Sequence, residues 1–297
     1  MTQSVRKFLN HSGYKFLSLD LETIGEWSPH DSEWNYSDAL HFPYIHKSFS
    51  QKILNICSET NTSLFVQNLF FLKNPVIIYQ EHKTKDSHEY LASSYGITIS
   101  IVTRHLTHKQ GAITKTNYQF FYSGFIGLLI AFSAKIATKK NYKKVISEDM
   151  PMRAQRGILR KTKNIFFKSD KNIVTPNSTL NPMDNNVFLR SGIILKKRFI
   201  LDDDFSSKIF EKVFLRVSKE KNKIIILPTI CPHEGSPLSD SDCHMRCKWH
   251  GRKIIPYISF NIGDSIRNAK FKHLNKTFII RSDHEKGKTF CELELQK

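Results

Sequence analysis

The sequence lacks the features that mark a secreted or membrane-spanning protein. Its N-terminal segment, MTQSVRKFLNHSGYKF, has neither the apolar run nor the small-residue cleavage site of a secretory signal. The most apolar stretch, residues 118–134, has an uninterrupted core of only about half the length that a membrane helix requires. We therefore expect no transmembrane segment, and we interpret this stretch as a buried strand or core helix.

The absence of two further sequence features, a disulfide-type cysteine pattern and a dinucleotide-binding motif, narrows the class of protein. Two of the five cysteines belong to a motif described below, and Cys57, Cys243 and Cys291 have unrelated spacings. This pattern predicts a reducing, cytoplasmic environment rather than a disulfide framework. The chain also has no glycine-rich dinucleotide fingerprint, so it is not expected to take electrons directly from NAD(P)H.

Acidic residues are few relative to basic ones. The chain has 45 Lys and Arg against 27 Asp and Glu, which gives a net charge of +18 and calls for acidic or phosphate-bearing partners. No zinc-finger helix, RRM-type aromatic box or helix-turn-helix pattern is present, so nucleic acid is not the expected partner. The basic clusters are predicted to be solvated faces, with docking of an acidic electron-donor protein, an anionic lipid or nucleic acid as the alternatives.

The order of sequence patterns predicts an α+β domain in the first half of the chain. Residues 1–30 have weak periodicity and are expected to form an irregular N-terminal leader. Apolar residues recur at helical intervals from Trp34 to Cys57, which predicts a helix that Pro43 kinks or delays. A second helix is expected at residues 147–162, with Pro151 in its first turn. Between these helices lie four β-rich runs, which predict an antiparallel meander: Ser63–Leu72, Pro75–Glu81, Gly96–Arg104 and Thr114–Tyr122.

These patterns predict two domains in a chain of 297 residues. Residues 31–167 are expected to form a helix-grip domain, in which the sheet wraps one face around a pocket. Residues 168–186 are polar and turn-forming and are expected to be a linker. Residues 187–297 are expected to form a second, all-β domain, with strands at 187–199, 212–217 and 223–229.

The second domain carries two pairs of metal-binding side chains on turn-forming segments. The sequence CPHEGSPL supplies Cys231 and His233, and CKWHG supplies Cys247 and His250. Tetrahedral zinc accepts two Cys and two His ligands, and so does a [2Fe–2S] cluster with two thiolates on one iron and two imidazoles on the other. The donor set alone leaves both metals open.

The residues around these ligands resemble the Rieske ferredoxin domain, whose two loops typically read CPHxGxxL and CxxHG. The resemblance implies a [2Fe–2S] cluster held by Cys231, His233, Cys247 and His250, with a structural zinc site as the alternative. The additional loop cysteines of the high-potential respiratory type are missing, since Ser236 follows Gly235. The cluster is therefore expected to be the lower-potential type that serves oxygenases.

A second candidate site lies in the first domain. The segment NYSDALHFPYIH supplies Asp38, His41 and His46, and two histidines with one carboxylate form the facial triad of non-haem Fe(II) sites. Together with the Rieske motif, this segment resembles the START-like catalytic domain of Rieske non-haem iron oxygenases. The resemblance implies that His41 and His46 bind iron and that Asp38, as a catalytic residue, orients His41 and links cluster to iron. It places the third ligand at Asp149, with Glu148 as the alternative.

The resemblance implies an oxidoreductase, a mono- or dioxygenase that hydroxylates or oxidises an apolar small molecule. Its cofactors would be a [2Fe–2S] cluster and Fe(II), its co-substrate O2, and its electron donor an external ferredoxin or reductase, with a homotrimer as a possible assembly. The domain order is reversed from that usual in the family. Two alternatives remain: a Rieske electron-transfer or ligand-binding protein without mononuclear iron, and a zinc-bearing module that binds nucleic acid.

Overall fold

The computed structural model describes most of the chain as two compact units, which divide between Gly157 and Ile158. The described residues are 5–46, 50–57, 62–69, 72–84, 87–94, 96–167, 187–202, 204–238, 246–251, 258–262, 267–271, 276–285 and 288–295. The expected linker, residues 168–186, lies outside them.

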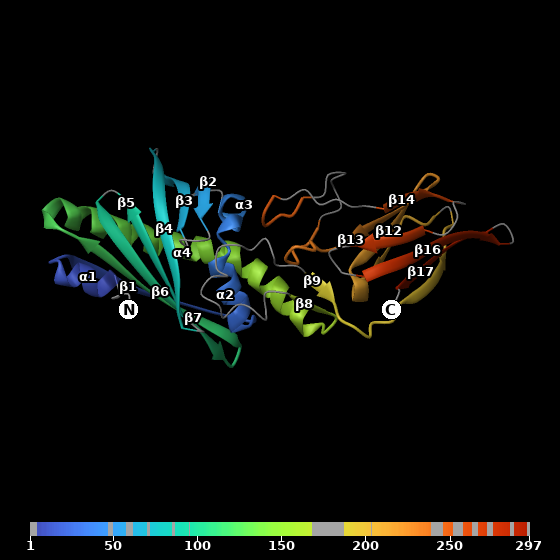
Figure 1. Cartoon of the computed structure of the whole chain (residues 1–297), viewed down its shortest axis with the longest axis horizontal. Helices are drawn as coiled ribbons and strands as arrows, with labels where there is room; N and C mark the ends of the chain where they lie inside the picture. The colour runs from blue at the N-terminus through green and yellow to red at the C-terminus, as the bar shows by residue number, and fades with distance from the viewer. Residues whose placement is uncertain are drawn as a thin grey trace. The chain divides into compact units, whose positions relative to one another are not determined.

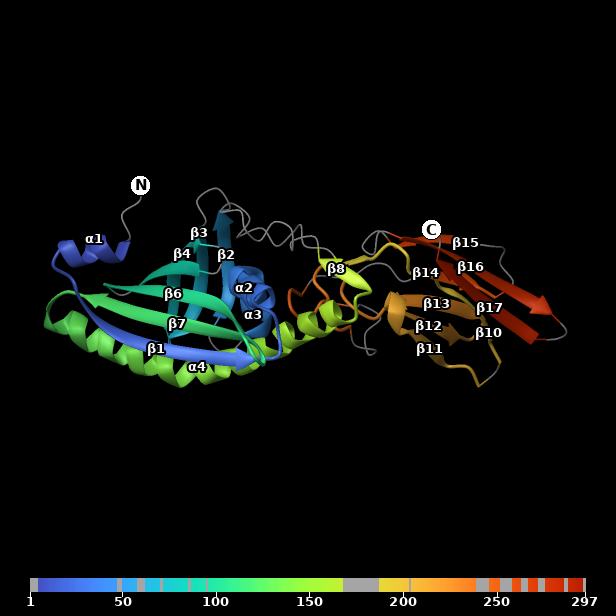
Figure 2. The same ribbon diagram turned by 90° about the horizontal axis from the view of Figure 1, so that it is seen from below.

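The first unit is built on a seven-stranded antiparallel sheet with the strand order β1-β7-β6-β5-β4-β3-β2. Its strands are β1 (Lys15–Gly25), β2 (Ser50–Cys57), β3 (Thr62–Leu69), β4 (Leu72–Thr84), β5 (Ser87–Ser94), β6 (Ile97–His108) and β7 (Gly111–Tyr122). Helix α4 (Gly124–Lys161) runs along one face of this sheet (Figures 1 and 2). Leu19, Phe120 and Ala131 form the apolar contact between sheet and helix.

The opposite face of the sheet carries α1 (Val5–His11). Side chains alternate along a strand, so Asn117 and Phe120 of β7 point to opposite faces. The guanidinium of Arg6 donates to the Asn117 Oδ1 at 2.7 Å and to the Ser100 Oγ at 2.7 Å. These hydrogen bonds attach α1 to the face that α4 does not cover.

The expected mixed class of helix and antiparallel sheet is confirmed, but three local expectations are wrong. Within the expected leader, Lys15–Gly25 is a strand that pairs along its whole length with β7. The expected helix from Trp34 to Cys57 ends early, and Ser50–Cys57 is a strand paired with β3. The last helix begins at Gly124 rather than near residue 147, so Pro151 lies inside it instead of in its first turn.

The second unit contains two four-stranded antiparallel sheets, as expected for an all-β domain. One has the order β10-β17-β16-β15 and the other β11-β12-β13-β14. Phe199, Ile280 and Leu293 of the first sheet share one apolar core with residues of the second, including Val217 and Ile226. The strands are β10 (Lys196–Ile200), β11 (Ser207–Phe210), β12 (Leu215–Glu220), β13 (Lys223–Pro228), β14 (Ile258–Asn261), β15 (Arg267–Phe271), β16 (Lys276–Glu285) and β17 (Lys288–Leu295).

A small two-stranded sheet also belongs to the second unit. β8 (Ile165–Phe167) pairs antiparallel with β9 (Val187–Leu189), and the rings of Phe166 and Phe188 stack 5.2 Å apart. Because of this pairing, β8 lies with the second unit, although it precedes the expected domain boundary at residue 167.

Candidate metal centres

The first candidate site begins where α2 (Pro29–Ser37) ends. Ser28 caps this helix: its hydroxyl accepts a hydrogen bond from the Asp31 N–H, and the Asp31 carboxylate accepts one from the Ser28 N–H. This capping box fixes the start of the helix. At the other end the Asp38 N–H donates to the Trp34 carbonyl, and the Asp38 backbone then leaves the helical region. The chain turns at Asp38 instead of continuing as one helix.

His41 and His46 come from two short elements that follow this turn. His41 ends a 3-10 turn (Ala39–His41), and His46 directly follows α3 (Phe42–Ile45). A long continuous helix was expected to bring the two rings together, and the structure does so through two short helical turns. The two Nε2 atoms lie 3.2 Å apart, and both side chains are buried.

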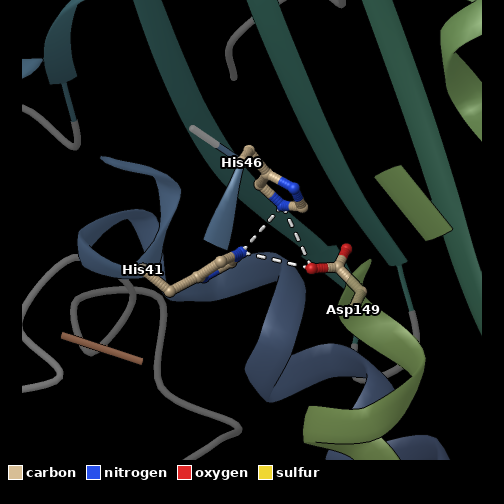
Figure 3. A group of neighbouring side chains, drawn as sticks. All are labelled: His41, His46 and Asp149. Atoms are coloured by element: carbon tan, nitrogen blue, oxygen red, sulfur yellow. Dashed lines mark hydrogen bonds and ion pairs between the residues drawn. The ribbon is translucent and has the colours of Figure 1, made fainter. Parts of the chain in front are cut away.

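Asp149 of α4 completes the group, as Figure 3 shows. Its Oδ1 lies 3.4 Å from the His41 Nε2 and 3.1 Å from the His46 Nε2. Two histidines close in sequence and an aspartate about a hundred residues later therefore direct three donor atoms at one point in the interior of the unit. Two imidazole nitrogens and one carboxylate oxygen are the donor set of a non-haem Fe(II) site, so the residues present fit that metal.

Each imidazole has a carboxylate next to its Nδ1, the ring nitrogen that does not face Asp149. The Asp38 Oδ2 lies 3.5 Å from the His41 Nδ1, and the Glu148 Oε2 lies 2.8 Å from the His46 Nδ1. A proton held on Nδ1 by a carboxylate leaves the Nε2 lone pair available for a metal. Glu148 thus contacts the far side of His46, whereas Asp149 faces both Nε2 atoms. The geometry favours Asp149 over Glu148 as the third ligand.

The electrostatics of the group favour positive charge at this point, which without a metal is a second proton on His41. Burial by itself raises the pKa of Asp149, but hydrogen bonds with His41 and His46 outweigh it and hold the pKa well below its ordinary value. Burial by itself lowers the pKa of His41, yet hydrogen bonds to Asp149 and Asp38 raise it to about 9. The carboxylates thus stabilise positive charge at this buried point.

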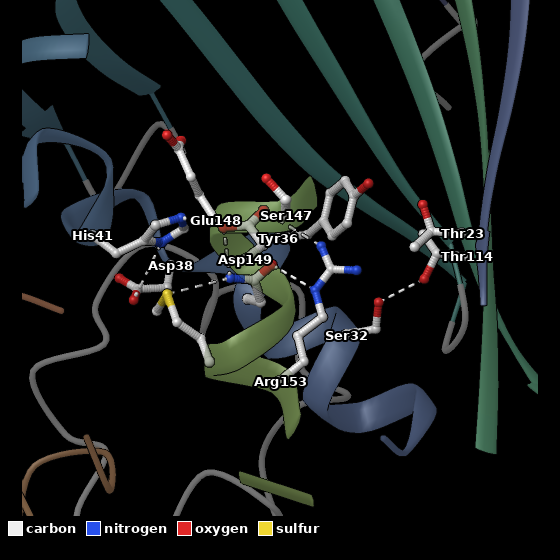
Figure 4. Close-up of polar contacts among 12 residues, drawn as sticks. Thr23, Ser32, Tyr36, Asp38, His41, Thr114, Ser147, Glu148, Asp149 and Arg153 are labelled. Atoms are coloured by element: carbon white, nitrogen blue, oxygen red, sulfur yellow. Dashed lines mark hydrogen bonds and ion pairs between the residues drawn. The ribbon is translucent and has the colours of Figure 1, made fainter. Parts of the chain in front are cut away.

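Arg153 belongs to a basic cluster that was expected to be a solvated face, but it is buried, and its guanidinium lies beside Asp149 (Figure 4). Its Nη2 lies 3.4 Å from the Asp149 Oδ2, and its Nε donates to the Asn35 Oδ1 at 2.8 Å. The guanidinium is fully buried and lies over the rings of Trp27 and Tyr36, at 5.5 and 5.1 Å. The available signal was the spacing, because residues four apart on a helix are neighbours and Arg153 follows Asp149 by one turn.

Replacing Glu148 with glutamine should weaken iron binding without abolishing it. The Glu148 carboxylate orients His46 through Nδ1, and loss of such an orienting partner typically costs about 10- to 100-fold in metal affinity. Asp149→Asn should have the larger effect, because it alters a direct donor. Iron titration of both variants measures the difference, and a greater loss in Glu148→Gln would reverse the assignment of the third ligand.

The second candidate site lies on two loops of the second unit that close in the same way. The Gly235 N–H donates to the Cys231 carbonyl at 2.7 Å, and the Gly251 N–H donates to the Cys247 carbonyl at 2.8 Å. Both glycines have positive φ, and a Cβ on Gly235 would lie 2.5 Å from the Leu159 Cδ1. Only glycine fits this turn without strain, which accounts for its place after the first ligand pair.

The loops bring the four expected ligands together. The Cys247 Sγ lies 3.5 Å from the His250 Nδ1, and the rings of His233 and His250 are 5.0 Å apart at nearly right angles. The other ring nitrogen of His250, Nε2, points toward the buried Glu234 carboxylate at 3.6 Å. His250 therefore directs its Nδ1, and not its Nε2, toward the Cys247 thiol.

The two thiols adjoin and differ in acidity. A hydrogen bond from Cys231 lowers the pKa of Cys247, and the same contact raises the pKa of Cys231. Metal ligation requires thiolates, and the lowered pKa of Cys247 together with the adjoining imidazoles fits a thiolate–imidazole metal centre.

Comparison with known families identifies the second centre by class. Residues 195–256 match the Rieske [2Fe-2S] domain. This match implies a [2Fe–2S] cluster, and with it an electron-transfer function and a redox partner for this part of the chain. No curated protein matches the sequence.

Solved structures match the first half of the chain weakly. A START superfamily protein from Mycobacterium smegmatis has 9% identity and a TM-score of 0.38, over 47% of this chain and 98% of its own. A protein of unknown function from Staphylococcus aureus has 8% identity and a TM-score of 0.38, over 51% of this chain and 99% of its own.

Proposed function

We propose that this chain is a Rieske non-haem iron oxygenase, which hydroxylates or oxidises an apolar small molecule with O2. The observation that supports the proposal most directly is the convergence of the His41 Nε2, the His46 Nε2 and the Asp149 Oδ1 within 3.4 Å of one another. This donor set is found in a chain that also carries a Rieske [2Fe-2S] domain. One centre suits electron delivery and the other suits O2 activation.

In this proposal the two centres have separate sets of ligands. Cys231, His233, Cys247 and His250 hold the cluster, and His41, His46 and Asp149 hold Fe(II). When bound, the cluster supplies single electrons and the iron supplies a site for O2 activation. Electrons come from an external ferredoxin or reductase, for which the positive charge of the chain suits an acidic donor.

The surrounding side chains keep the iron ligands in place. The Asp38 carboxylate faces the His41 Nδ1 at 3.5 Å, and the Glu148 carboxylate hydrogen-bonds to the His46 Nδ1 at 2.8 Å. Arg153 binds the other oxygen of the Asp149 carboxylate, so that Oδ1 stays directed at the histidines. Ligands with such fixed supports need little reorganisation when the metal binds. An additional role for Asp38 in electron transfer stays a prediction.

Iron content and product analysis test the proposal. Protein purified without oxygen should be reddish-brown, show a rhombic EPR signal when reduced, and hold about three iron atoms per chain. After chemical reduction, incubation with labelled O2 and a panel of apolar small molecules should give a product that carries the label. A count of about two irons with no labelled product favours the electron carrier, and a colourless zinc protein contradicts the oxygenase.

One observation favours a second candidate, a Rieske electron-transfer or ligand-binding protein without mononuclear iron. His41, His46 and Asp149 lie within hydrogen-bonding distance of one another, so the three side chains can satisfy each other directly. In that case replacing His41 or His46 would leave the function intact.

A further inference from the structure

The first half of α4 is apolar on the side that faces away from the sheet. Five apolar side chains there are each more than half exposed, and we call them the apolar stripe: Phe125, Ile126, Leu129, Phe132 and Ile136. With 3.6 residues per turn they fall on one side of the helix over about 17 Å of its length. Phe125 and Ile126 are the most exposed, at 72% and 73%.

The apolar stripe is not the surface that holds α4 on the sheet. That contact is made by the other side of the helix, through Ala131 with Ile130 and Ala134 beside it. This part of α4 is therefore apolar on both sides, although only one side packs against the sheet (Figure 2). A helix that is apolar all round is normally buried, and a contiguous exposed apolar patch normally marks an interaction site.

Four exposed lysines lie on the same side of α4, after the apolar stripe. Lys139, Lys140, Lys143 and Lys144 all lie within eight residues of the end of the apolar stripe and share its orientation by the helical period. The sequence has no Asp or Glu between Gly124 and Ser147, so nothing on this length of helix offsets their charge. The side of α4 that faces away from the sheet thus combines large apolar side chains with a block of positive charge.

We propose that this side of α4 binds the surface of an anionic lipid bilayer. The apolar stripe enters the boundary between headgroups and acyl chains, and the four lysines contact the acidic headgroups beside it. An amphipathic helix with aromatic and aliphatic residues plus lysines is typical of helices that lie in this boundary. None of the described helices has the length and apolarity needed to cross a membrane.

The charge of α4 favours an anionic bilayer over a second copy of the chain as the partner of this surface. Pairing of two copies through α4 would bring two lysine blocks into the same interface, in a protein whose net charge of +18 already opposes self-association. An anionic bilayer complements the lysines and accepts the apolar stripe without a shaped groove. If the proposed oxygenase activity is correct, the same contact would bring the enzyme to the phase in which apolar substrates dissolve.

Vesicle co-sedimentation of the intact protein tests the proposal without reference to its activity. We expect strong binding to phosphatidylcholine vesicles that contain phosphatidylglycerol and little binding to phosphatidylcholine alone. Raising the salt concentration should weaken the binding, because exposed charges are screened. Equal binding to both kinds of vesicle, or binding to neither, overturns the proposal.

Matched variants locate the contact on α4. Each of two multiple variants should weaken vesicle binding at least about tenfold: Phe125→Ser with Phe132→Ser, and Lys139→Gln, Lys140→Gln, Lys143→Gln and Lys144→Gln together. The controls change equally exposed residues elsewhere and should bind as the parent does: Ile194→Ser with Ile209→Ser, and Lys109→Gln, Lys208→Gln, Lys221→Gln and Lys223→Gln together.

Three results would overturn the assignment of this surface to a bilayer. In the first, the lysine control loses as much binding as the α4 lysine variant, which would make net charge the cause. In the second, light scattering shows an oligomer that the Phe125→Ser, Phe132→Ser variant dissociates, which would assign the stripe to a second copy. In the third, both α4 variants bind vesicles normally but lose binding to an acidic electron-donor protein. The lysine variant removes no buried side chain, so it stays informative if the phenylalanine variant unfolds.

Discussion

In the proposed oxygenase, replacing His41 with alanine is expected to remove the mononuclear iron and to leave the Rieske cluster in place. His41 is one of the three proposed ligands, and its Nε2 lies 3.2 Å from the His46 Nε2 and 3.4 Å from the Asp149 Oδ1. Without it, one imidazole and one carboxylate remain, and affinity for iron should fall by more than the roughly 10- to 100-fold that loss of an orienting partner costs. Iron should drop from about three atoms per chain to about two, and formation of labelled product should stop.

The absorption and EPR spectra of the cluster serve as the internal control for this variant. They should be unchanged, because the cluster ligands lie on loops of the second unit. A His11→Ala variant provides a matched substitution, since His11 is exposed at the end of α1 and should keep all the iron. If His41→Ala retained the third iron, the ligand assignment would be wrong. If the parent protein itself held two, the electron-carrier alternative would gain support.

The candidate metal-binding residues can be picked out from the sequence because their spacing is local. Cys231 and His233 lie on one tight loop and Cys247 and His250 on another, and each loop is closed by a glycine four residues after its cysteine. The pair His41 and His46 was also readable as a short-range pattern. The expected single long helix carrying this pair is wrong. It was expected because apolar residues keep a helical spacing past His46 into Ser50–Cys57, which is a strand. Pairing with β3 decides the conformation of that segment, and tertiary context of this kind overrides local propensity.

Apart from Asp149, which the family resemblance supplied, features that depend on distant parts of the chain could not be read from local sequence patterns. The hydrogen bond between His46 and Glu148 joins residues 102 positions apart, and it exists only because α4 lies against the end of α3. β1 pairs with β7, about a hundred residues later, so its weak local pattern gave no indication of its place in the sheet. α4 was predicted specifically only near its C-terminal end, because the apolar residues of its first half left a buried strand and a core helix both open. The expected burial of that half is wrong, since Phe125, Ile126 and Phe132 are exposed.

The second large effect is expected at Arg153, and it concerns stability as much as metal binding. Its side chain is fully buried and contacts Asn35, Asp149 and two aromatic rings. Replacement with methionine keeps much of the volume but removes the guanidinium, leaving the Asp149 carboxylate without this partner. Removal of one member of a buried ion pair costs about 3–5 kcal/mol, so we expect a loss of this order in the free energy of unfolding of the iron-free protein.

The variant Arg153→Lys separates the effect of the positive charge from the effect of the guanidinium geometry. An ammonium group keeps the positive charge beside Asp149 but lacks the fork that reaches Asn35 and Asp149 together. Arg153→Lys should therefore recover part of the stability lost in Arg153→Met while iron binding stays weakened. Lys161→Met, at an exposed position of the same helix, should change the unfolding free energy by no more than about 0.5 kcal/mol. Urea denaturation and iron titration of the three variants measure both effects. Normal stability and normal iron binding in Arg153→Met would show that Asp149 holds its position without the guanidinium.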